Sequence, residues 1–319
     1  SAGEGIAVLP PSFTGTYFTE TMDNTGDFVN WGVFVDGTYQ ITDTIRIAAG
    51  LRYSYDEKEY TWQTYESDLD WPFAPERVNY NPAETGAPED QWFDKFSDTD
   101  DWSKTTGRLV LDWQFTDYAM TYASVATGYK SGGFNGQSFG AVIAGSFAPE
   151  EMTSYEIGLK GDFFNETLRT EVAIFHHKLD GKQDQKSVKN GPDDPTAAPG
   201  VVSSDEKADG IELIVTWSIT DTLRVAGLTT YRETENISDL YYNSAGELSG
   251  GNKSIGETNT QYTLKLDWTP EIAFGYMLLH MNYQYAEVSG PNLDSVIYAT
   301  GPWYFQDKKL LNARLAWSN

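Results

Sequence analysis

The sequence repeats a unit in which two long segments of alternating polarity meet at a very short turn, while the connection to the next unit is long and polar. The short turns lie at residues 41–45, 115–118, 165–167, 219–223 and 269–271, and the first and fourth are nearly identical. The long connections cover about 57–102, 130–152, 181–207, 236–258 and 289–304. Short turns on one rim and long loops on the other are typical of transmembrane β-barrels.

Within the segments, apolar side chains alternate with polar ones. Between Tyr262 and Trp268 every second residue is Tyr, Leu or Trp, and the residues between them are Thr, Lys and Asp. A period of two indicates a β-strand whose two faces meet different surroundings. We predict eleven strands, at about 29–41, 45–56, 104–115, 118–129, 153–164, 168–179, 208–219, 223–235, 259–268, 275–287 and 305–317.

The strands of a soluble β-sandwich also alternate between apolar and polar residues. Strand length and the placement of aromatic residues must therefore decide between a membrane barrel and a soluble protein. The predicted strands have ten or more residues, which suits the roughly 9 to 11 needed to cross a bilayer at a tilt. Aromatic residues gather next to the short turns, as they would at a membrane interface: Trp113, Phe115, Tyr118, Phe163, Trp217, Trp268, Tyr276 and Trp317. We therefore expect an all-β, transmembrane antiparallel β-barrel, with a soluble all-β protein as the alternative.

The barrel hypothesis fixes the position of individual residues. The apolar set that should face lipid includes Leu159, Leu213, Val215, Leu264, Leu266 and Leu279. The turns that contain Asp43, Asp117, Glu166, Asp221 and Glu271 should share the periplasmic rim, and Trp71, Asn135, Gly191 and Gly250 should lie on the extracellular rim. Charged residues on the other face, such as Arg46, Arg52, Arg108, Glu156, Lys160, Asp162, Arg169, Glu171, Glu212 and Arg224, should line the lumen and mostly pair with one another or with a plug.

Composition excludes several other classes of protein. The 319 residues include no cysteine, the mean hydropathy is −0.48, and no apolar run reaches the roughly 18 residues of a membrane helix. A net charge of −25 argues against a nucleic-acid partner. The adjacent His176 and His177 point to opposite faces of a strand, so they cannot share a metal. We expect no enzymatic activity, no metal site and no cofactor.

Residues 122–135, with the sequence YASVATGYKSGGFN, resemble a characteristic segment of TonB-dependent outer-membrane receptors of the siderophore-receptor-like group. Similar matches follow at residues 147–161 and 168–175, and shorter ones at 50–53 and 311–315. Together they cover the chain from about Trp31 to its end. Each string alone is weak, but the combination is specific.

This resemblance implies a barrel of about 22 strands around an N-terminal plug. It implies active import of a scarce, bulky ligand (a ferric siderophore, or a similar iron, cofactor or oligosaccharide nutrient) into a bacterium through its outer membrane. A TonB-type protein would supply the energy through the plug, and lipid and lipopolysaccharide would surround the barrel. Because eleven strands is an odd number, residues 1–319 are expected to be a C-terminal portion of the barrel, with the plug and the closing strands absent. Alternatives are a passive channel and a barrel-based adhesin or phage receptor.

Seven residues are candidates for contact with the ligand. Four of them are tryptophans of the long aromatic and acidic loop at 57–102: Trp62, Trp71, Trp92 and Trp102. The other three belong to the motif at 122–135: Tyr129, Phe134 and Asn135. The alternative for the loop is a surface cover packed on itself. Gly128, Gly132, Gly133 and Gly136 of the motif are expected to shape the loop. Local basic residues, Lys182, Lys186 and Lys189, could give the acidic mouth a positive region.

Overall fold

The computed structural model describes residues 3–5, 20–64, 95–135, 145–189, 191–192, 197–251, 253–254, 258–287 and 307–318. Within these ranges, no helix is long and apolar enough to span a bilayer.

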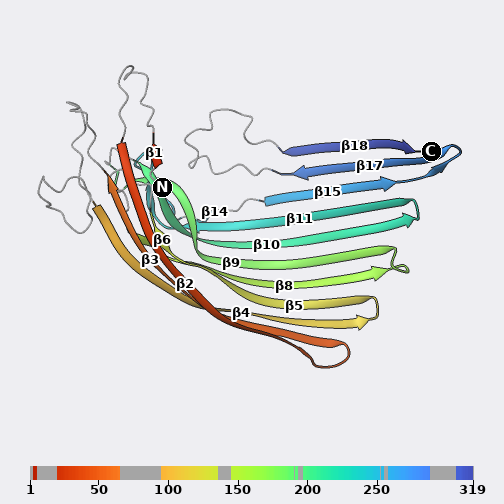
Figure 1. Cartoon of the computed structure of the whole chain (residues 1–319), viewed down its shortest axis with the longest axis horizontal. Coiled ribbons are helices and arrows are strands. Elements are labelled where there is room, and N and C mark those ends of the chain that lie inside the picture. Colours follow the sequence, from red (N-terminus) through yellow and green to blue (C-terminus); the bar gives the residue numbers. More distant parts are fainter. Residues whose placement is uncertain are drawn as a thin grey trace, which may run out of the picture.

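Eleven long strands form one curved antiparallel sheet, in which every strand pairs with the next long strand along the chain (Figure 1). They are β2 (Glu20–Gln40), β3 (Ile45–Thr64), β4 (Lys95–Thr116), β5 (Ala119–Lys130), β8 (Glu150–Phe163), β9 (Leu168–Lys189), β10 (Ala198–Thr220), β11 (Leu223–Ser238), β15 (Thr258–Trp268), β17 (Gly275–Ala286) and β18 (Lys308–Ser318). Short strands flank them: β1 (Gly3–Gly5), β6 (Gly133–Phe134), β7 (Ser146–Phe147), β12 (Tyr241–Asn243), β13 (Leu248–Ser249), β14 (Lys253–Ser254) and β16 (Glu271–Ile272). The predicted all-β antiparallel fold and its eleven main strands are confirmed.

The short turns lie at one end of the sheet and the long connections at the other, on the right and left of Figure 1. The turn after β2 is held by the Thr42 hydroxyl, which accepts a hydrogen bond from the Ile45 amide at 3.0 Å. The turn between β8 and β9 places Asn165 and Glu166 at φ values of 55° and 66°. The predicted separation into two rims is confirmed for the described residues, and Trp71 lies outside them.

Several strands are longer than predicted on the side of the long connections. β3 and β4 stay paired from Glu57 opposite Asp101 to Gln63 opposite Lys95, where the sequence predicted a loop. Likewise, β9 and β10 occupy most of the predicted loop at 181–207. The prediction was wrong there because it required apolar residues to continue on the face predicted to meet lipid, where β3 carries Glu57 and Glu59. Beyond this point backbone pairing continues with polar residues on that face, while Tyr60 on the opposite face is buried.

The register gathers the apolar side chains on one face of the sheet. The six residues predicted to face lipid, Leu159, Leu213, Val215, Leu264, Leu266 and Leu279, all lie on it. Near the turns this face carries Trp113, Trp217, Trp268 and Trp317. Farther along the strands it carries a second aromatic belt that the sequence analysis did not assign: Tyr55, Tyr155, Tyr231, Tyr262 and Tyr285. Two belts on one apolar face are the expected anchors at the two membrane interfaces.

The opposite, polar face is held together by contacts between neighbouring and next-neighbouring strands. Arg108 of β4 reaches across β3 to Asp36 of β2, with two hydrogen bonds of 2.8 and 2.7 Å. Gly50 of β3 makes room for this pair, because a Cβ there would lie 2.3 Å from the Asp36 carboxylate. Arg46 of β3 pairs with Asp112, which lies directly opposite it on β4, at 2.6 Å. Much of the predicted pairing among charges on this face is therefore present within the sheet itself.

Candidate functional site

At the loop end of the sheet, the connection between β5 and β8 folds back over the polar face. Its two arms pair as β6 and β7, which brings the motif residue Phe134 against the wall. The Phe134 ring stacks on Tyr60 of β3, with centroids 5.6 Å apart and planes 10° apart, and meets Trp102 of β4 edge-on at 6.3 Å. We call the group of Lys58, Tyr60, Trp102, Gly132 and Phe134 the mouth corner.

Lys58 ties this corner to the backbone of the motif. Its ammonium group donates a hydrogen bond to the Gly132 carbonyl and lies 5.5 Å from the centre of the Trp102 ring. Burial lowers the pKa of Lys58, since it disfavours the charged form. A Cβ on Gly132 would approach the Trp102 ring to 2.5 Å. Gly132 is therefore required by close packing, whereas its φ is not in the left-handed region.

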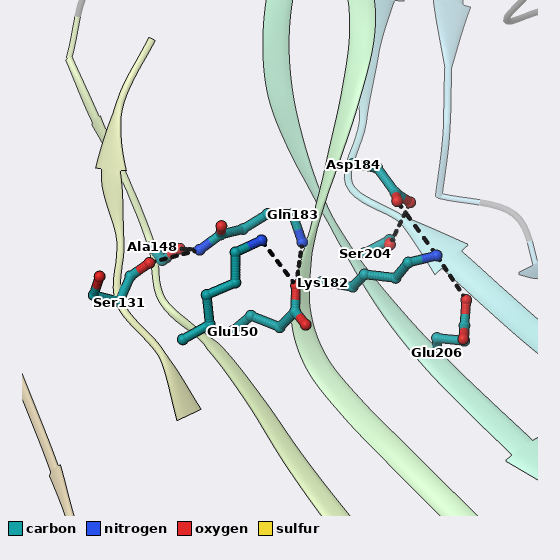
Figure 2. Close-up of polar contacts among 9 residues, drawn as sticks. Ser131, Ala148, Glu150, Lys182, Gln183, Asp184, Ser204 and Glu206 are labelled. Atoms are coloured by element: carbon teal, nitrogen blue, oxygen red, sulfur yellow. Dashed lines mark hydrogen bonds and ion pairs between the residues drawn. The ribbon is translucent and has the colours of Figure 1, made fainter. Parts of the chain in front are cut away.

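The far side of the same connection is fastened to β9 and β10. The Asn135 side-chain oxygen accepts a hydrogen bond from the Val201 amide at 3.0 Å, and only 8% of Asn135 is exposed. The Gln183 side chain donates to the carbonyls of Ser131 and Ala148, both at 3.0 Å (Figure 2). The motif thus bridges β3 and β4 on one side and β9 and β10 on the other.

A bulge in β9 positions this second fastening. Two residues of β9, Asp180 and Gly181, lie opposite Asp205 alone, so the alternation of β9 shifts by one residue beyond this point. Gly181 has a φ of 68°, in the left-handed region that favours glycine. As a result Lys182, rather than its neighbours, lines up with Ser204 of β10.

Lys182 is neutralised by two carboxylates. Its ammonium group lies 2.7 Å from Glu206 and 3.3 Å from Asp184, and the Ser204 hydroxyl donates to Asp184 at 2.9 Å (Figure 2). Burial acts to lower the pKa of Lys182, but the hydrogen bond to Glu206 and the charge of Asp184 outweigh it, so the pKa is raised. Lys186 lies over the Tyr241 ring at 5.0 Å. Lys182 is thus already engaged by carboxylates of the wall.

Beside the mouth corner lies a polar cavity of about 280 Å³, between β2, β3 and the end of β5. It is lined by Asn30, Trp31, Gly32, Arg52, Ser54, Asp56, Tyr129 and Ser131. Arg52 and Asp56 project from β3, and the register places Asn30 of β2 opposite Asp56. The cavity contains one cation, one carboxylate and several hydroxyl groups, so it can bind a small group that both accepts and donates hydrogen bonds.

The structure brings some of the seven predicted site residues together. Trp102 and Phe134 meet in the mouth corner, Asn135 fastens the same connection, and Tyr129 lines the adjacent cavity. The backbone of Trp62 lies in β3 opposite Phe96, and its side chain is not among those that the structure describes. Trp71 and Trp92 lie outside the described residues.

The sequence analysis missed two residues that hold this region. Lys58 was assigned to a loop, and nothing in its neighbourhood distinguished it from other surface lysines. Gln183 also carried no signal, but Gly181 just before it could have indicated a bulge, since an isolated glycine in a strand often marks one. Side-chain contacts between distant strands leave no pattern in the local sequence.

The family model for the TonB dependent receptor-like β-barrel matches residues 6–318. The chain is 25% identical over 237 residues to the pesticin receptor of Yersinia pestis, an alignment that covers 72% of this chain and 30% of the receptor. It therefore spans about 30% of the length of the curated relatives that it matches.

Solved structures share the fold at low sequence identity. The ferric yersiniabactin uptake receptor FyuA from Yersinia pestis gives a TM-score of 0.66 at 16% identity, over 98% of this chain and 41% of that chain. The ferric-catecholate import receptor Fiu from Escherichia coli K12 gives 0.60 at 16% identity, over 95% of this chain and 39% of that chain. At such identities the likeness shows the fold alone.

Proposed function

Because the chain belongs to the TonB dependent receptor-like β-barrel family, we propose that it forms part of the wall of an outer-membrane receptor that imports a scarce, bulky ligand with energy from a TonB system. The family consists of transport receptors of the outer membrane of Gram-negative bacteria, not of enzymes. The observation that carries the proposal is the family match along residues 6–318. Transport, ligand and energy coupling belong to the whole parent protein, of which this chain is a barrel portion.

The ligand class that we propose is a ferric siderophore. Two proteins with this fold are named for the uptake of ferric yersiniabactin and of ferric catecholates. Lipid would contact the apolar face of the sheet between the two aromatic belts, and lipopolysaccharide would contact the same face above them. A barrel of about 22 strands would then enclose the polar face and a plug that couples to the TonB-type protein.

Uptake by the full-length parent tests this proposal. Cells that express it should accumulate iron from a ferric siderophore, and deletion of the TonB-type protein should abolish the accumulation. Uptake that is unchanged without this protein would instead identify a passive channel. Surface attachment or phage binding without any uptake would identify an adhesin or receptor of the third class.

We further propose that the connection between β3 and β4 contacts the ligand through Trp71 and Trp92, while Trp102 and Phe134 hold the wall beneath it. Deleting residues 66–93 leaves both paired strand ends in place and should lower ligand affinity without unfolding the barrel, because surface loops contribute little to strand pairing. The matched control is a parent in which a polar linker of the same length replaces residues 66–93. Wild-type affinity in both variants would show that this connection is only a cover.

A further inference from the structure

The polar cavity beside the mouth corner contains a cation that the wall does not neutralise. The Arg52 side chain donates to the Ser54 hydroxyl at 2.9 Å and, among the described residues, forms no ion pair. Gly32 leaves the space that its guanidinium occupies, because a Cβ at Gly32 would lie 2.8 Å from an Arg52 nitrogen. Arg46 and Arg108, on the same face, are each paired with an aspartate. Arg52 thus keeps several donors for a ligand.

A buried hydroxyl group faces the same cavity. The Tyr129 hydroxyl is buried and interacts with the Asp56 carboxylate beside it. Leaving a buried hydroxyl unsatisfied costs free energy, so such groups normally have a partner. The Tyr129 hydroxyl and the Arg52 guanidinium can both donate a hydrogen bond to a ligand atom in this cavity.

Asp56 adds a second requirement. Its carboxylate lines the cavity and disfavours a purely anionic occupant, but it accepts hydrogen bonds from an O–H or N–H donor. The volume of about 280 Å³ is close to the lower end of the range of small-molecule sites, roughly 300 Å³. A group the size of one substituted ring fits, whereas a whole bulky ligand does not.

We propose that this cavity is a subsite for a hydroxy-acid group, whose carboxylate binds Arg52 and whose hydroxyl donates to Asp56. In the parent receptor this group would be one arm of the imported ligand, and in that respect the inference rests on the proposed function. Tyr129 would donate to the oxygen that Arg52 holds. Charge-assisted contacts to a planar guanidinium provide both strength and orientation.

Three small probes separate these contacts: 2-hydroxybenzoate carries both groups, benzoate lacks the hydroxyl and phenol lacks the carboxylate. Titration of the purified full-length parent should rank 2-hydroxybenzoate above benzoate and benzoate above phenol. In Arg52→Gln, the affinities for 2-hydroxybenzoate and benzoate should fall by about tenfold or more, because both probes carry a carboxylate. The affinity for phenol should not change. In Asp56→Ala, which removes the acceptor, the preference for 2-hydroxybenzoate over benzoate should disappear. Arg224→Gln, the same change on the polar face of β11, should leave all three affinities unchanged.

Wild-type affinities in Arg52→Gln, or no saturable binding of 2-hydroxybenzoate to the parent, would overturn the inference. Heat-modifiable migration in electrophoresis checks that every variant has folded. The outcome is independent of the uptake test. TonB-dependent uptake without probe binding would refute the subsite alone, whereas probe binding with the predicted variant pattern in a parent that lacks TonB-dependent uptake would refute the proposed function.

Discussion

The side chains of each strand are determined by different surroundings near the short turns and near the long connections. On the turn side each strand contacts mainly its neighbours. The apolar face of β15, where Leu264 is 52% exposed, is not covered by any of the residues that the structure describes. On the loop side a folded connection packs on the polar face, and the bulge at Gly181 shifts the alternation. Lipid imposes one requirement on every strand, whereas specific tertiary contacts impose a different one at each residue.

The largest loss of stability should come from a charge placed on the apolar face near the short turns. Leu264→Arg places a guanidinium where we expect the middle of the bilayer, so it should destabilise the folded parent by roughly 2 to 4 kcal/mol. Lys265→Gln, on the opposite face of β15, is the matched control and should cost far less. Urea titration of the parent in lipid vesicles measures both. Equal losses would mean that the two faces do not differ in their surroundings, and the comparison would fail.

A smaller effect is expected from the bulge that sets the loop-side alternation. Gly181→Ala forces alanine into a left-handed conformation and brings its Cβ to 2.8 Å from the Pro149 carbonyl, so we expect a loss of about 2 kcal/mol. Gly191→Ala is the control, because a Cβ there meets nothing within 4 Å. Thermal unfolding of the parent variants compares them. If Gly181→Ala is as stable as the control, the bulge is not held by its glycine.

The same contrast explains how much could be predicted from the sequence. The eleven strands and the lipid-side residues were predictable because an alternation of period two encodes them, and the short turns were predictable because turn residues interrupt that alternation. Strand ends were not, since pairing beyond the lipid needs no alternation, as between Glu57 and Asp101. The motif was singled out as a family signature and as a candidate ligand contact, but its packing role was not visible. The two partners of Phe134, which are Tyr60 and Trp102, lie far away in the sequence.

The smallest effect should separate packing from ligand contact at the motif itself. Asn135→Ala removes the acceptor for the Val201 amide, which water at the mouth can partly replace, so we expect a loss of about 1 kcal/mol. Asn135→Asp keeps the oxygen and should recover part of it. Amide hydrogen exchange of the parent should show faster exchange at Val201 in the alanine variant only. If Val201 is unaffected and ligand affinity falls instead, Asn135 acts in binding, and the loop side would be specified by the ligand rather than by the wall.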